Sequence, residues 1–158
     1  MESACSGGVT AMEKILLCNL DLLRKNDYAS NNDFISRLDL FLDNKNNDVI
    51  FFSRNVAEVE KAKEFYENKG KRYYFFSRNQ VNQLVDQNRN DTSEFVVVGS
   101  KNIDFQLAVN NQLLLLSPKW IQCEEKAERY GILINTTRQL FQIADALNNY
   151  NSWYTVSA

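Results

Sequence analysis

Histidine is absent from this sequence of 158 residues, and proline and cysteine are scarce, with one and three residues respectively. Without histidine there is no Ser-His-Asp triad, no histidine general base and no histidine metal ligand. The cysteines form no Cys-x-x-Cys pair, which excludes the common zinc sites. Any catalysis must therefore use carboxylates, hydroxyl groups, lysine or a metal ion that prefers oxygen ligands.

Long apolar runs and an excess of positive charge are also missing. No uninterrupted apolar run approaches the roughly 20 residues that cross a bilayer, so we expect no membrane partner. A formal net charge of -2 provides no broad positive field, so nucleic acid is not the expected partner. Cys18 and Cys123 lie in apolar patterns typical of buried free thiols, which favours a reducing, cytoplasmic location.

The start of the chain differs from the rest in composition. Residues 1–11 have neither a basic segment nor an apolar stretch, so they do not resemble a signal peptide. We expect Met12 to be the natural start and residues 1–11 to be a disordered leader or an expression remnant. With 44% hydrophobic residues and no visible linker, residues 12–158 are expected to form a single domain.

Short apolar runs alternate with segments of helical period, which is typical of βαβ units around a buried parallel sheet. The pattern predicts an α/β fold of the three-layer, Rossmann-like kind, with a mostly parallel sheet of five or six strands. The expected strands are Lys14–Cys18, Val49–Phe52, Tyr73–Phe76, Glu94–Val98, Gln112–Leu116 and a short one over Ile132–Ile134.

Two of these strands end in the same pentapeptide, Phe-Phe-Ser-Arg-Asn, at residues 51–55 and 75–79. Only one unit separates the two copies, which indicates reuse of a strand-to-helix junction rather than a solenoid repeat. Ser53 and Ser77 are each placed to cap the following helix, and Ser77 forms a capping box with Gln80.

The candidate site residues directly follow predicted strands. Ligands of open parallel sheets bind at the carboxyl ends of the strands, where Asn19, Asp21, Ser53, Lys101 and Asp104 occur. We also expect the helix N-termini after the second and fourth strands to present free N–H groups to an anion. Each residue has a simpler explanation, because serine caps helices and lysine is common on surfaces.

Three segments resemble motifs of the haloacid dehalogenase-like (HAD) superfamily, in the order that this family has them. Ile15–Asp21 is similar to the first motif, an apolar strand that ends in Asp-x-Asp. Val49–Ser53 resembles the second, a strand that ends in Ser or Thr, and Phe95–Asp104 the fourth, a strand followed by Gly-Asp and a later Asp. The resemblance covers roughly residues 14–119, and it implies that the first strand is central, between the second and the fourth.

The family's catalytic roles are only partly present. In the family the first Asp attacks a phosphoryl group and the second is the general acid/base, and these positions hold Asn19 and Asp21. The amide of Asn19 is a very poor nucleophile. Leu23 replaces a threonine, Ser100 replaces the acid after the fourth motif's glycine, and Lys101 would have to supply the charge of the third motif's lysine.

The resemblance implies a weak Mg²⁺ site made by Asn19, Asp21 and Asp104, because Mg²⁺ prefers oxygen ligands and few charges remain. The catalytic set that it implies is Asn19, Asp21, Ser53 and Lys101. No cap domain fits between Asn19 and the helix near Asp33, so the site should be open. Capless members of the family tend to act on large or protein-borne substrates, which favours a macromolecular partner.

Three hypotheses for the function follow. The first is a degenerate HAD-like domain that binds a phosphorylated ligand or a protein partner. The second is a Mg²⁺-dependent HAD phosphatase in which Asn19 replaces the nucleophile, naturally or by engineering. The third is a receiver-like signalling domain with Lys119 after the fifth strand, but the third strand ends in Phe76-Ser77 and supplies no phosphoacceptor Asp.

Overall fold

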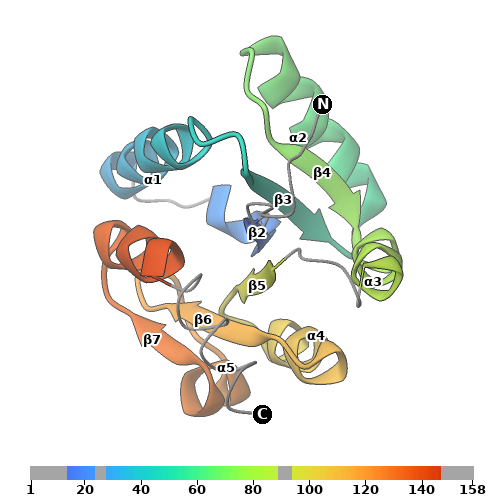
Figure 1. The fold of residues 1–158 in the computed structure, drawn as a ribbon, viewed down its shortest axis with the longest axis vertical. Coiled ribbons are helices and arrows are strands. Elements are labelled where there is room, and N and C mark those ends of the chain that lie inside the picture. Colours follow the sequence, from blue (N-terminus) through green and yellow to red (C-terminus); the bar gives the residue numbers. More distant parts are fainter. Residues whose placement is uncertain (1–13, 24–27, 89–93, 147–158) are drawn as a thin grey trace, which may run out of the picture.

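Six parallel strands form one sheet in a computed structural model that describes residues 14–23, 28–88 and 94–146 (Figure 1). The strand order is β4-β3-β2-β5-β6-β7, and neighbours pair in parallel throughout. The strands are β2 (Lys14–Asn19), β3 (Asn47–Ser53), β4 (Tyr74–Ser77), β5 (Glu94–Val98), β6 (Leu114–Pro118) and β7 (Ile132–Ile134). The predicted fold class and the central position of the first strand are confirmed. Residues 1–11, the expected leader, lie outside the described residues.

Helices cover both faces of this sheet and give the fold three layers (Figure 1). They are η1 (Leu20–Leu23), α1 (Tyr28–Phe41), α2 (Val56–Asn68), α3 (Arg78–Gln87), α4 (Asn102–Asn111), α5 (Glu125–Tyr130) and a helix over residues 137–146. One core cluster joins the sheet to α1, α2 and the last helix, and the other joins it to α3, α4 and α5. None of the helices in the described part of the chain has the length and apolar character needed to cross a membrane.

The central strands β2, β3 and β5 are mostly apolar because both of their faces are buried. In β2, Leu16 and Cys18 belong to one core cluster while Ile15 and Leu17 belong to the other. Alternate side chains of a strand point to opposite faces, so a single apolar run serves both layers. The same run leads directly into Asn19, which brings a polar side chain to the carboxyl edge of the most buried part of the sheet.

Two local predictions are wrong. The fifth strand begins at Leu114 rather than Gln112, because α4 continues to Asn111 and Gln112 ends it in the left-handed conformation, with a φ of 57°. Ser53 does not cap α2: the N-cap is Asn55, whose side chain accepts the Glu58 N–H. The capping box of α3 is confirmed, since Ser77 and Gln80 exchange both expected hydrogen bonds.

Candidate functional site

The carboxyl ends of β2 and β5 bring four of the five candidate residues together. Asn19 is the last residue of β2, and Asp21 follows in η1. Lys101 precedes α4, and Asp104 lies in the first turn of that helix. Because Cys18 pairs with Val98 across the two strands, the segments that follow leave the sheet side by side. Residues about 85 positions apart in sequence therefore meet at one point.

A hydrogen-bonded pair of Asn19 and Asp104 forms the floor of this site. The Asn19 amide nitrogen donates to both carboxylate oxygens of Asp104, at 2.9 Å and 3.1 Å. The Asn19 amide oxygen accepts the backbone N–H of Asp21 at 2.9 Å. Both ends of the amide are thus used, since its nitrogen donates to Asp104 while its oxygen accepts from the backbone. An aspartate in the same place would have no hydrogen to offer.

Asp104 is completely buried, with 0% of its surface exposed. Its Oδ2 atom also accepts the backbone N–H of Lys101 at 3.1 Å. Burial raises the pKa of Asp104 to about 6, against the hydrogen bonds from Asn19 and Lys101, which lower it. A Cβ atom added at Gly99 would lie 2.1 Å from Oδ2 of Asp104, so the carboxylate occupies the space that a side chain at this position would need.

Lys101 and Asp21 form an ion pair above this floor, with 2.8 Å between Nζ and Oδ2. The hydrogen bond to Asp21 raises the pKa of Lys101, so the lysine stays charged. The side chains are 49% and 28% exposed, and ion pairs at such positions contribute less than about 1 kcal/mol to stability. The pair is therefore easy to rearrange, and a ligand can compete with Asp21 for the ammonium group.

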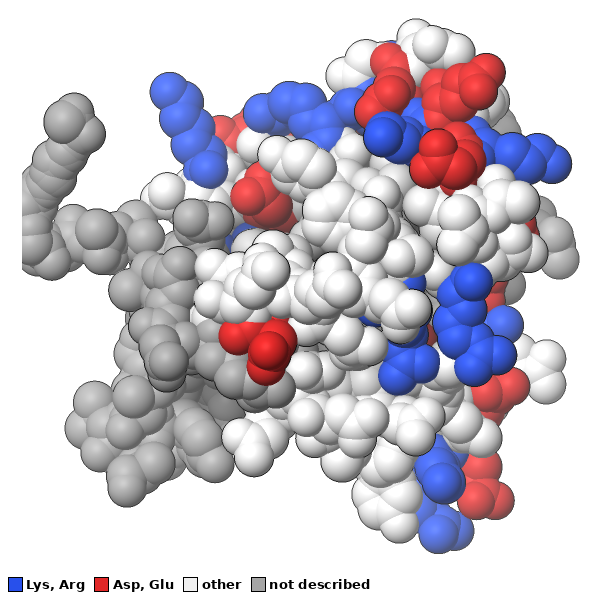
Figure 2. All heavy atoms as spheres, turned by 90° about the vertical axis from the view of Figure 1, so that its right-hand side faces the viewer, with Lys and Arg blue, Asp and Glu red and all other residues white. Residues whose placement is uncertain are grey.

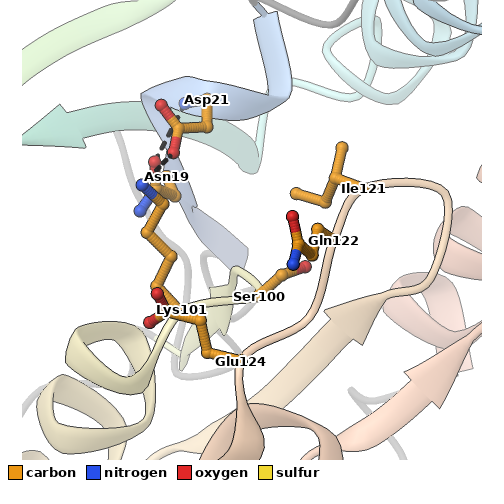
Figure 3. A pocket seen from close by; sticks show the side chains of 7 residues that line it. All are labelled: Asn19, Asp21, Ser100, Lys101, Ile121, Gln122 and Glu124. Carbon is orange, nitrogen blue, oxygen red and sulfur yellow. Dashed lines mark hydrogen bonds and ion pairs between the residues drawn. The ribbon is translucent and has the colours of Figure 1, made fainter.

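An open cavity of about 480 Å³ lies over these residues (Figure 3). Its lining residues are Asn19, Asp21, Ser100, Lys101, Ile121, Gln122 and Glu124. The last three come from the loop after β6, and the sequence reasoning missed them because it considered only the first residues after that strand. The same rule of strand ends would have found them, had it been extended along the segment between β6 and α5. The lining carries one lysine and two carboxylates, so it has no excess of positive charge.

Ser53, the fifth candidate, does not line this cavity. It ends β3, the strand next to β2, but its hydroxyl accepts the N–H of Asn55 at 3.1 Å. Free N–H groups were expected at the N-termini of α2 and α4, and this is wrong for the groups whose hydrogen bonds the structure shows. At α2 the Glu58 N–H donates to the Asn55 side chain. The N–H groups of Lys101 and Asn102 donate to the side chains of Asp104 and Glu124, at 3.1 Å and 2.8 Å.

The predicted magnesium ligands Asn19, Asp21 and Asp104 lie together but are engaged with one another. Among the described residues no group of three or more acidic, histidine or cysteine side chains is arranged to hold a metal ion. Asp104 accepts hydrogen bonds at both oxygens, and the Asn19 oxygen accepts the Asp21 N–H. Asp104 is also fully buried, so a cation could reach it only after a rearrangement of these groups. The magnesium ion thus stays a prediction of the resemblance.

The buried carboxyl predicts a pH dependence of stability. The pKa of Asp104 rises from 3.8 to about 6 on folding, so the folded state binds the proton more tightly. The resulting stability is complete below pH 3.8 and is lost as pH rises through about 6, a change of about 3 kcal/mol. Urea unfolding of Asp104→Asn between these pH values should lack this slope.

The matched control is Asp43→Asn, which removes a carboxylate that is mostly exposed and 3.9 Å from Arg72. This variant should keep the pH slope of the unchanged chain. If Asp104→Asn kept the same slope as the control, the carboxyl would not have the raised pKa described above.

The strand order, the central first strand and the meeting of Asn19 with Asp104 agree with what the HAD resemblance implies. These three observations concern only the fold and the carboxyl edge of the sheet. The family assignment itself stays a prediction. We find no significant match to a family model, to a curated protein sequence or to a solved structure.

Proposed function

We propose that this chain is a HAD-like domain without catalytic activity that binds a phosphorylated ligand in the open cavity at Asn19, Asp21 and Lys101. The observation that carries the proposal is the pair of hydrogen bonds from the Asn19 amide to Asp104. The position of the family's nucleophile holds an amide that is part of the internal bonding of the site. The proposed role of this amide is to donate hydrogen bonds to a buried carboxylate.

Two further side chains support the absence of catalysis. Leu23, at the family's threonine position, is buried in the core and brings no polar group to the cavity. Ser100, at the position of a family acid, donates its hydroxyl to the carbonyl oxygen of Pro118 at 2.8 Å. Phosphoryl transfer needs positioned hydrogen-bond donors and charges around the transferred group, and these two replacements remove one hydroxyl group and one carboxylate.

Lys101 is the group that supports a phosphorylated ligand, because its positive charge can pair with a phosphate. It is the single cation among the described lining residues, and its ammonium group is paired with Asp21 (Figure 3). A phosphate group that enters must displace Asp21 from the ammonium group, so the affinity should be modest. The cavity is open, which leaves room for a ligand carried on a partner protein.

The alternative is a Mg²⁺-dependent phosphatase whose nucleophile is replaced by Asn19. The convergence of Asn19, Asp21 and Lys101 on one cavity favours it, since these positions correspond to the family's reactive groups. In this case Asp21 would be the general acid/base, and its removal would abolish turnover.

The substitution Asp21→Asn separates the two functions, because they require opposite results. In a binding domain it frees Lys101, so phenyl phosphate should bind more tightly, by several-fold, in isothermal titration calorimetry. Glu124 and Asp104 also act on the charge of this lysine, but more weakly than Asp21. Lys101→Met should weaken the same binding, and neither variant should differ from the unchanged chain in hydrolysis of an aryl phosphate.

Two outcomes would contradict the proposal. Mg²⁺-dependent hydrolysis of an aryl phosphate that is abolished by Asp21→Asn would favour the phosphatase. An affinity for phenyl phosphate that changes in neither Asp21→Asn nor Lys101→Met would show that the ligand does not enter this cavity.

A further inference from the structure

The two copies of Phe-Phe-Ser-Arg-Asn are neighbours in space as well as repeats in sequence. They end β3 and β4, which pair in parallel with Phe51 opposite Phe75 and Ser53 opposite Ser77. Equal positions of the two copies therefore lie side by side. The arginines that follow the serines, Arg54 and Arg78, leave adjacent strands at the same level of the carboxyl edge.

Both arginines open onto one groove of about 420 Å³ between α3 and α4. Its lining residues are Arg54, Val56, Ser77, Arg78, Asn79, Asn82, Gln106 and Asn110. Two are cationic, most of the others carry amides or a hydroxyl, and none of these eight residues is acidic. Figure 2 shows the face that carries α3 and α4, where Lys and Arg side chains gather near the centre beside a broad uncharged surface.

Arg78 carries a donor that the described residues 14–23, 28–88 and 94–146 leave without an acceptor. The Nε atom of Arg78 is buried and has no hydrogen-bond partner there. Burial lowers the pKa of Arg78, the charge of the buried Asp104 raises it, and the smaller effect of the nearby Arg54 charge lowers it. Two like charges and a buried donor without an acceptor are unfavourable, and an anion in the groove would relieve both.

We propose that this groove binds the phosphate group of a small phosphate monoester. The two guanidinium forks match the oxygens and the double negative charge of such a group. The amides of Asn79 and Gln106 line the groove beyond the arginines and suit hydroxyl groups on the rest of the ligand. The inference goes beyond the proposed function, because the groove shares no lining residue with the cavity at Asn19.

The side-chain Nε–H signals of ¹⁵N-labelled arginine test the proposal in the intact chain. Addition of inorganic phosphate should shift the Arg78 signal in a saturable way, because its buried Nε gains an acceptor. Ribose 5-phosphate should bind more tightly than inorganic phosphate, and ribose alone should leave the signal unchanged. Arg54→Gln and Arg78→Gln should each weaken binding at least about tenfold, the usual effect of losing one charge-assisted hydrogen bond.

The matched control is Arg138→Gln, which makes the same charge change on the exposed surface of the helix over residues 137–146. It should leave the affinity unchanged. The proposal is overturned if the Arg78 signal shows no saturable shift, or if Arg138→Gln weakens binding as much as Arg78→Gln. A ribose 5-phosphate that binds more weakly than inorganic phosphate would overturn the assignment of a monoester. Loss of this shift in Lys101→Met would instead place the anion in the other cavity.

Discussion

Replacing Asn19 by Asp should destabilise the protein by about 3 to 5 kcal/mol at pH 7. The substitution removes both hydrogen bonds that the Asn19 amide donates to Asp104, and it places a second carboxylate at hydrogen-bond distance from the first. Because like charges so close raise their pKa values, the pair should share one proton in mildly acidic solution. Urea unfolding should therefore show that much of the loss disappears by about pH 5, where the shared proton restores a donor.

Asn47→Asp is the control for this substitution. Asn47 is also a buried amide in a strand, and its nitrogen donates to the carbonyl oxygen of Phe41 at 3.0 Å. Its substitution removes a buried hydrogen bond, but the acceptor of that bond is a carbonyl oxygen and not a second carboxylate. The recovery of stability at low pH should therefore be smaller. Equal stability of Asn19→Asp and the unchanged chain at pH 7 would contradict the role given to the Asn19 amide.

The same variant tests whether the site is decayed or only lacks its nucleophile. Two carboxylates at positions 19 and 104, with Asp21, would resemble the metal ligands of the family. We expect weak hydrolysis of an aryl phosphate with Mg²⁺, or none, because Leu23 brings no polar group and the Ser100 hydroxyl replaces a carboxylate and is bonded to the Pro118 carbonyl oxygen. Gain of turnover by orders of magnitude, together with a rise of the melting temperature in Mg²⁺, would support the phosphatase alternative.

Gly99→Ala should be the second most disruptive change, with a loss of about 2 to 4 kcal/mol. The new Cβ would lie 2.1 Å from Oδ2 and 2.4 Å from Cγ of Asp104, which is fully buried and has no room to withdraw. The carboxylate would have to give up the hydrogen bonds from Asn19 and from the Lys101 N–H. Chemical denaturation at pH 7 measures the loss, and the pH slope assigned to Asp104 should change with it.

A double-mutant cycle separates this clash from the general effect of replacing a glycine. Because Asp104→Ala removes the atoms that the new methyl group meets, Gly99→Ala should cost much less in its background. Gly70→Ala is the control, since a Cβ there meets nothing within 4 Å and only the positive φ of 74° opposes it, at about 1 to 2 kcal/mol. Additive effects of Gly99→Ala and Asp104→Ala would contradict the contact between the two residues.

Most of the fold was predictable because a parallel sheet buried on both faces has a simple sequence signature. The apolar runs that contain Leu16, Ile50 and Val97 are too short for helices and are separated by segments of helical period. The boundary at Gln112 was not predictable, because glutamine has no preference that marks the end of a helix. Its left-handed conformation depends on how α4 meets β6.

The sequence alone determined which residue types stand at the strand ends: an amide at Asn19, carboxylates at Asp21 and Asp104, a lysine at Lys101 and two identical arginine-bearing junctions. Local patterns and strand periodicity are enough for this, since they depend on neighbouring residues. Only the tertiary structure decided the pairing. Asp104 is buried against Gly99 and accepts hydrogen bonds from the Asn19 amide, while Lys101 forms its ion pair with Asp21. The pairing of β3 with β4 likewise brought the two copies of the repeat, and with them Arg54 and Arg78, next to each other. The register between strands is set by packing across the sheet, which the sequence pattern does not reveal.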